Sequence, residues 1–168
     1  VNNDPVVGQE AISNLRSLLR KHKKSVRLVG LSGVGKTRFV HALFEKEVGK
    51  DFLDPATVFY TDSSDQPVPR PLDLLNWLIA EGASGVLIID NCSDALHSKL
   101  TTLLKASNAA LSLLTVEYDI RKDLPAETNA FLLEPGSKEG VANVIIRRHP
   151  FISQIGALHV SNLAGGNY

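Results

Sequence analysis

Residues 30–37 read Gly-Leu-Ser-Gly-Val-Gly-Lys-Thr, which is a complete G-x-x-x-x-G-K-T pattern. The apolar run 26–29 precedes this segment, and the helix-like stretch 38–48 follows it. A strand that enters the loop and a helix that leaves it are the context that phosphate binding requires. The alternative, a glycine-rich turn before a helix, is disfavoured because this context is present. The segment therefore predicts a binding site for a nucleoside triphosphate.

Each residue type in this loop has a physical task. Gly30, Gly33 and Gly35 let the backbone turn its N–H groups toward phosphate oxygens with no Cβ in the way. The helix that begins near Lys36 adds the positive end of its dipole. We expect Lys36 to reach the β- and γ-phosphates and Thr37 to supply one Mg²⁺ ligand. The residues of this segment predicted to contact nucleotide are Gly30, Ser32, Gly33, Val34, Gly35, Lys36, Thr37 and Arg38.

A second apolar run ends in an acid. Residues 86–89 read Val-Leu-Ile-Ile, which is typical of a strand buried on both faces of a parallel sheet, and Asp90 follows. We expect the Asp90 carboxylate to hold Mg²⁺ opposite Thr37, directly or through water. Asn91 stands where many ATPases carry a general base; its amide accepts no proton but can position a water. A turn residue is the alternative for Asn91, and both interpretations stay open. Lys36, Asp90 and Asn91 are the candidate catalytic residues.

Strand-like and helix-like segments alternate along the chain. The expected strands are 26–29, 58–60, 86–89, 111–116 and 130–133, and the expected helices are 10–22, 38–48, 72–80, 94–106, 137–148 and 152–164. This alternation predicts an α/β fold of the P-loop NTPase type, a three-layer αβα sandwich around a mainly parallel five-stranded sheet. Ligands bind at the carboxyl ends of strands in such sheets, where Lys36, Thr37 and Asp90 all fall.

The sequence also predicts the roles of three side chains outside these motifs. We expect Trp77 to lie in the core and Asp94 to cap the helix that begins there. The single Cys92 excludes an intramolecular disulfide and fits a reducing cytoplasm, and a packed, inert thiol is the favoured interpretation.

Length and charge set further bounds. The 168 residues fit one domain, with 1–24 as an N-terminal start segment and helix and 137–168 as C-terminal helices. Lys plus Arg and Asp plus Glu both number 18, so no global basic field indicates nucleic acid or an anionic membrane. No apolar stretch approaches the roughly 20 residues of a membrane span. The chain lacks Met and ends in Gly165-Gly166-Asn167-Tyr168, so we expect a domain of a longer protein.

Together these motifs resemble the nucleotide-binding domain of STAND ATPases, signal-transducing relatives of the AAA+ proteins that include NB-ARC domains. The matching segments are 6–10 (Val-Val-Gly-Gln-Glu, with Gln9 where the family has Arg), 30–37, 86–91, 130–136 and 163–167. More narrowly, residues 30–39, 88–92 and 113–121 are similar to bacterial STAND proteins of antiviral defence. The resemblance implies ATP or ADP with Mg²⁺ as cofactors, Val6 and Val7 against the adenine, and Arg38 near the ribose or base edge. It also implies partners: other domains of the parent chain (a winged helix, sensor and effector regions) and a homo-oligomer on activation.

One departure concerns the fourth strand. The family commonly ends it in an arginine that senses the γ-phosphate, whereas this chain has Thr115-Val116-Glu117. Arg121 either reaches back to the phosphate or is a solvated loop charge, and both interpretations stay open. With Asn91 and Glu117 at these two positions, the sequence shows neither a proton acceptor nor this arginine, so we expect slow hydrolysis.

Three functions fit these motifs. The first is an ATP-operated switch in which nucleotide exchange or slow hydrolysis controls assembly. The second is an AAA+ motor or DNA-replication-type ATPase, which predicts an acid after Asp90 and a polar sensor on the fourth strand. The third is a small-molecule kinase, whose arginine-rich lid would have only Arg147-Arg148 as a candidate. A GTPase is disfavoured because no Asn/Thr-Lys-x-Asp base-reading motif is present.

Overall fold

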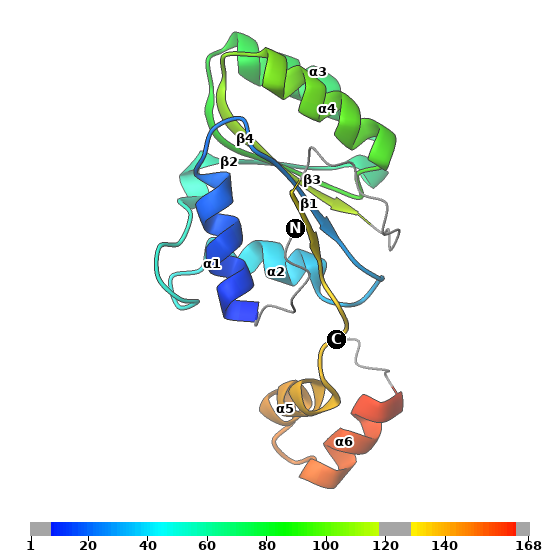
Figure 1. The fold of residues 1–168 in the computed structure, drawn as a ribbon. Coiled ribbons are helices and arrows are strands. Elements are labelled where there is room, and N and C mark those ends of the chain that lie inside the picture. Colours follow the sequence, from blue (N-terminus) through cyan, green and yellow to red (C-terminus); the bar gives the residue numbers. More distant parts are fainter. Residues whose placement is uncertain (1–7, 118–128, 164–168) are drawn as a thin grey trace.

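A parallel sheet forms the centre of the molecule. The computed structural model describes residues 8–117 and 129–163. Its strands are β1 (Ser25–Val29), β2 (Val58–Asp62), β3 (Ser84–Asp90), β4 (Ala110–Glu117) and β5 (Asn129–Leu132). They form one five-stranded sheet in the order β2-β3-β4-β1-β5, and every neighbouring pair is parallel (Figure 1). This confirms the predicted α/β fold class. Because β4 lies between β1 and β3, its carboxyl end lies between the glycine-rich loop and Asp90.

Helices cover both faces of this sheet. These helices are α1 (Gly8–Leu19), α2 (Lys36–Ala42), α3 (Pro71–Ala80) and α4 (Asp94–Ala106), with short 3₁₀ turns at Pro55–Thr57 and Ser63–Asp65. Two further helices, α5 (Lys138–Arg148) and α6 (Gln154–Leu163), follow β5. α1 and α2 lie on one face, and α3 and α4 lie on the other (Figure 1). None of the helices described within 8–117 and 129–163 combines the length and apolar character that a membrane span requires.

The core consists of two apolar layers, one on each side of the sheet. Side chains alternate along a strand, so Ile88 of β3 belongs to the same apolar cluster as Leu15 of α1. Its neighbour Ile89 belongs to the opposite cluster, together with Leu100 of α4. Burial of both faces explains why residues 86–89 of β3 form a continuous apolar run in the sequence.

α2 is shorter than the predicted helix 38–48, because it ends at Ala42 and is followed by turns. The apolar spacing of Val40, Phe44 and Val48 continues the helical period, which explains the overprediction. A side chain from α1 satisfies the backbone where the helix stops. The Arg16 guanidinium, only 1% exposed, donates to the carbonyls of Ala42, Leu43, Glu45, Val48 and Lys50 at 2.6–3.0 Å.

Two further expectations need correction. Trp77 lies on the outer side of α3 and is 57% exposed, because the helix buries Pro71, Leu75 and Leu78 instead. The N-cap of α4 is Ser93, whose Oγ accepts from the Leu96 N–H at 3.3 Å, while Asp94 lies in the first turn. Cys92 is buried as expected, and burial raises the pKa of its thiol to about 12.

The chain leaves the sheet after β5 and forms a pair of helices. α5 and α6 pack against each other and lie apart from the three layers, below the end of β5 in Figure 1. Both helices fall close to the expected ranges 137–148 and 152–164.

Candidate phosphate-binding site

The glycine-rich loop lies between β1 and α2, at the carboxyl edge of the sheet. Gly35 is the N-cap of α2 and adopts a left-handed conformation with φ 92°, which a glycine accommodates without strain. A Cβ at Gly30 would collide with the backbone carbonyl oxygen of Leu133, just beyond β5. The loop therefore needs glycine at these two positions for different reasons, one conformational and one steric.

Lys36 extends over this loop. Its Nζ donates to the carbonyl oxygens of Gly30 and Leu31, both at 2.8 Å. Partial burial lowers the pKa of Lys36, while the nearby Asp90 carboxylate acts in the opposite direction. The ammonium group thus lies at the loop, where it can bind an anion.

Asp90, at the end of β3, accepts hydrogen bonds on both carboxylate oxygens. Thr37 Oγ1 lies 3.3 Å and the Tyr60 hydroxyl 3.2 Å from its Oδ2, and the backbone N–H of Asn91 lies 2.9 Å from its Oδ1. The side chain of Asp90 is buried. The fold therefore brings together Thr37 and Asp90, which lie 53 residues apart in the sequence.

These oxygens fit the requirements of Mg²⁺. The ion prefers hard oxygen donors and is usually held by one or two protein groups together with water and substrate phosphates. The Thr37 hydroxyl and the Asp90 carboxylate form such a donor set. The described part of the chain holds no cluster of three or more His, Cys, Asp or Glu side chains that would suit a metal held by protein alone.

Asn91 occupies a turn. Its φ is 50°, a left-handed conformation that asparagine adopts more readily than most residues. Its side-chain amide donates to both carboxylate oxygens of Asp62, at 2.9 and 3.0 Å, and this contact is the main reason that the pKa of Asp62 is lowered. The turn interpretation therefore explains this residue's geometry, since its amide N–H groups are directed at Asp62.

A cavity of about 290 Å³ opens at this edge of the sheet. It is lined by Ser32, Lys36, Asp90, Asn91, Val116 and Glu117. Four of these residues are among the predicted site residues, and two come from the end of β4. Small-molecule sites usually measure roughly 300–1,000 Å³, so this cavity lies at the lower end of that range.

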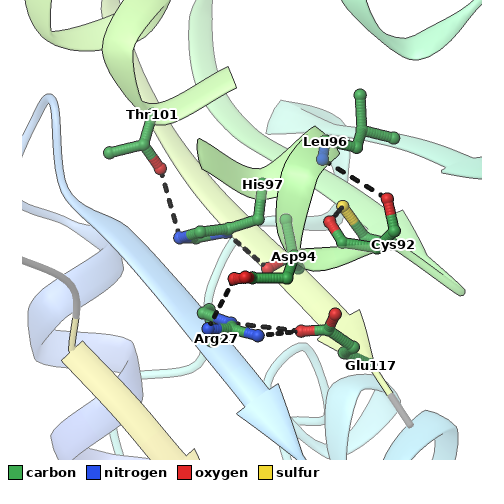
Figure 2. A network of polar contacts seen from close by, with 9 residues as sticks. Arg27, Cys92, Asp94, Leu96, His97, Thr101 and Glu117 are labelled. Carbon is green, nitrogen blue, oxygen red and sulfur yellow. Dashed lines mark hydrogen bonds and ion pairs between the residues drawn. The ribbon is translucent and has the colours of Figure 1, made fainter. Parts of the chain in front are cut away.

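Glu117 is held by a buried arginine. Arg27 of β1, only 2% exposed, contacts Glu117 Oε2 through Nε at 3.1 Å and also through Nη2. Its Nη1 lies 3.0 Å from Oδ1 of Asp94. Figure 2 shows the Arg27 guanidinium between the two carboxylates, with His97 on the far side of Asp94.

The same network reaches the interior of α4. His97 Nδ1 lies 2.8 Å from Thr115 Oγ1, and its Nε2 lies 3.2 Å from Thr101 Oγ1 (Figure 2). Burial lowers the pKa of His97 to about 4. A neutral imidazole therefore joins α4 to β4 beside the ion pairs.

Sequence reasoning missed Arg27 and Tyr60. Arg27 interrupts the apolar strand Val26-Arg27-Leu28-Val29, and a charge inside such a run needs a buried partner, so the signal was present. Tyr60 is half exposed on β2, and only the sheet order brings its hydroxyl to Asp90.

Other predicted site residues lie as follows. Val34 is buried beneath the loop, while Ser32 and Gly33 are exposed on it. The exposed Arg38 side chain forms an ion pair with Glu45. Val6, Val7 and Arg121 lie outside the described residues.

Comparison with known proteins gives the fold. Neither a family model nor a curated protein sequence matches the chain. A STAND protein with a tetratricopeptide repeat sensor, PH0952 from Pyrococcus horikoshii, is similar with a TM-score of 0.55 and 14% identity over 98% of this chain. Trip13 from Rhizobiales is similar with a TM-score of 0.57 and 12% identity, also over 98% of this chain. The chain spans 28% of the PH0952 structure and 76% of the Trip13 structure. At such identities the likeness shows the fold alone, an α/β fold with helices on both faces of a parallel sheet.

Proposed function

We propose that this chain is an ATP-binding switch domain in which Mg²⁺-dependent nucleotide binding, followed by slow hydrolysis, controls assembly of a larger protein. One observation carries the proposal. The hydroxyl of Thr37 and the carboxylate of Asp90 lie 3.3 Å apart beside the Lys36 ammonium, at the edge of the sheet where a glycine-rich loop enters α2.

Each residue contributes a specific interaction. The loop backbone and Lys36 bind the β- and γ-phosphates, and Ser32 lies at the cavity wall beside them. Thr37 and Asp90 hold Mg²⁺, which when bound offsets the charge of the phosphate oxygens. Tyr60 fixes the orientation of the Asp90 carboxylate through its hydroxyl.

The finer parts of the proposal rest on the family resemblance. They are adenine contact through Val6 and Val7, ribose contact through Arg38, and partners in the parent chain: a winged helix, a sensor and an effector region. The resemblance to STAND ATPases, and to the antiviral-defence proteins among them, is also the ground for proposing a homo-oligomer on activation and a cytoplasmic location. The sensor repeats named for PH0952 are compatible with this scheme.

A motor ATPase is the second candidate, and one observation favours it. Glu117 lines the cavity, so the site does contain an acid besides Asp90, although not at the position after it.

Replacing Lys36 tests phosphate binding. We expect Lys36→Ala to remove a charge-assisted contact worth about 1.5–3 kcal/mol, or about one to two decades of ATP affinity. Isothermal calorimetry with ATP and Mg²⁺ measures the change, and Lys99→Ala, at an exposed lysine of α4, is the matched control. Equal affinity in Lys36→Ala and wild type contradicts the phosphate site. Tighter binding of GTP than of ATP contradicts only the adenine preference.

A further inference from the structure

The end of β4 places the carboxylate of Glu117 in the middle of the candidate site. Glu117 pairs in register with Val29, the residue directly before Gly30, and Thr115 pairs with Ile89, the residue directly before Asp90. Glu117 therefore lies at the strand end between the two halves of the site, and it lines the cavity together with Lys36.

Arg27 fixes one oxygen of this carboxylate and leaves the other available. Both of its hydrogen bonds to Glu117 fall on Oε2. Oε1 takes part in none of the hydrogen bonds found among residues 8–117 and 129–163. The two contacts from Arg27 hold the carboxylate in one orientation, and a general base needs such a positioned acceptor oxygen.

The other polar side chains near the cavity already have hydrogen-bond partners or a proposed role in metal binding. Asp90 accepts from Thr37, Tyr60 and the Asn91 backbone, and in the proposed function it holds Mg²⁺. The amide of Asn91 cannot accept a proton, and Asp62 is bound to that amide outside the cavity lining. Of the carboxylates that line the cavity in the described structure, Glu117 is the one without a metal to hold.

We propose that Glu117 is the general base for ATP hydrolysis at this site, an inference that rests on the proposed function. The oxygen of a water molecule forms a bond to the γ-phosphorus, and one proton of that water passes to Glu117 Oε1. The bond between the γ-phosphorus and the bridging oxygen breaks, and its electron pair leaves with ADP. Glu117 then releases the proton to solvent or phosphate, so that the products are ADP, inorganic phosphate and a proton. Arg27 is a positioning residue in this reaction.

The test separates catalysis from structure with two isosteric variants in the intact protein. Glu117→Gln removes the proton acceptor but keeps the side-chain shape, and Asp94→Asn changes the other partner of Arg27, which lies outside the cavity lining. We expect Glu117→Gln to lower kcat by about 10²–10⁴-fold, the usual contribution of general-base catalysis. We expect Asp94→Asn to keep kcat within about threefold, because no proton acceptor is lost.

Binding is the second measurement. We expect Glu117→Gln to bind ATP with Mg²⁺ as tightly as wild type or more tightly, since a negative charge beside the phosphates is removed. The variant should also retain ATP rather than ADP when bound nucleotide is extracted and identified after incubation. Loss of ATP binding in Glu117→Gln with a normal circular dichroism spectrum contradicts the inference.

The remaining outcomes are also decisive. Wild-type kcat in Glu117→Gln, or equal losses in Glu117→Gln and Asp94→Asn, overturns the assignment. If Glu117→Gln does not fold, Glu117→Asp replaces it, because this variant keeps the charge and moves the carboxylate by one methylene. ATP hydrolysis by Glu117→Asp at the wild-type rate also overturns the assignment. A wild-type protein that binds ATP without hydrolysing it overturns the general base and the hydrolysis step of the proposed function, while the proposed nucleotide binding stands. A wild-type protein that binds no ATP overturns the proposed function.

Discussion

At Asp90, three hydrogen bonds hold one carboxylate in a single orientation. Two of the donors share Oδ2, the oxygen that faces Thr37, and one comes from a different strand, β2. A carboxylate fixed in this way loses little side-chain entropy when it binds a cation. The same orientation would be retained without metal, so binding of Mg²⁺ needs no rearrangement of the residue.

Replacement of Asp90 distinguishes a metal ligand from a structural acid. We expect Asp90→Ala to weaken ATP binding more in Mg²⁺ than in EDTA, because only the metal-bridged contact is lost. Calorimetry in the two buffers measures this difference. Asp62→Ala is the matched control, because Asp62 stands in register with Asp90 on the neighbouring strand. A loss of the same size in both buffers would show that Asp90 is structural.

Among single residues, those in local motifs were predictable and those defined by long-range pairing were not. Lys36, Thr37 and Asp90 stand in patterns that the chain itself displays. In the sequence, Glu117 was recognised only as the residue that stands where the family commonly has an arginine. Its pairing with Arg27 was not predicted, because the two residues lie 90 positions apart. A buried ion pair between two strands follows from sheet order, which the local pattern does not specify.

Among elements, the strands were predicted more accurately than α2. Burial on both faces leaves a continuous apolar run in β3 and a mainly apolar segment in β4. A helix end depends on what satisfies its last carbonyls, and here that group is Arg16, which lies 26 residues earlier in the sequence than Ala42. The buried face of a helix is also difficult to predict when apolar residues occur on every side of it, as in α3. For this reason the prediction that Trp77 lies in the core was wrong.

Arg16 is therefore expected to stabilise the segment that follows α2. Arg16→Met should lower the free energy of unfolding by about 3 kcal/mol, because it leaves several buried carbonyls without a charged donor. Urea unfolding monitored by circular dichroism measures this change. Arg20→Met is the control, since the guanidinium of Arg20 contacts two carbonyls at the exposed surface and should contribute less than about 1 kcal/mol. Equal losses of unfolding free energy in the two variants would mean that the burial of Arg16 does not determine its contribution to stability.

At the scale of the whole molecule, the proposed function makes the rate of hydrolysis depend on which cations reach the phosphates. Lys36 is the cation among the cavity-lining residues that the structure describes, since Arg27 is buried against Glu117. An arginine that stabilises the transition state contributes about 10³–10⁵-fold in phosphoryl transfer. We therefore infer that chemistry in this domain is slow until another part of the protein, or another molecule, supplies such a group.

Turnover by the 168-residue chain tests this inference. We expect phosphate release well below about 1 s⁻¹, at a specific activity that does not change with protein concentration. A phosphate-release assay over a series of concentrations makes the measurement. Turnover typical of ordinary enzymes would favour the motor. Activity that rises with concentration would show that copies of this chain complete one another's sites.

The contact between Gly30 and Leu133 has a mechanical consequence. The glycine-rich loop touches the carbonyl oxygen of Leu133 so closely that not even a methyl group fits between them, and the N–H of Leu133 donates to Val29 at 2.8 Å. Leu133 directly follows β5, whose continuation carries α5 and α6. A junction of backbone against backbone has little compressibility, because no side chain can change rotamer to absorb strain. A displacement of the loop at Gly30 toward β5 would therefore have to move the backbone at Leu133, where the chain leaves the sheet toward α5.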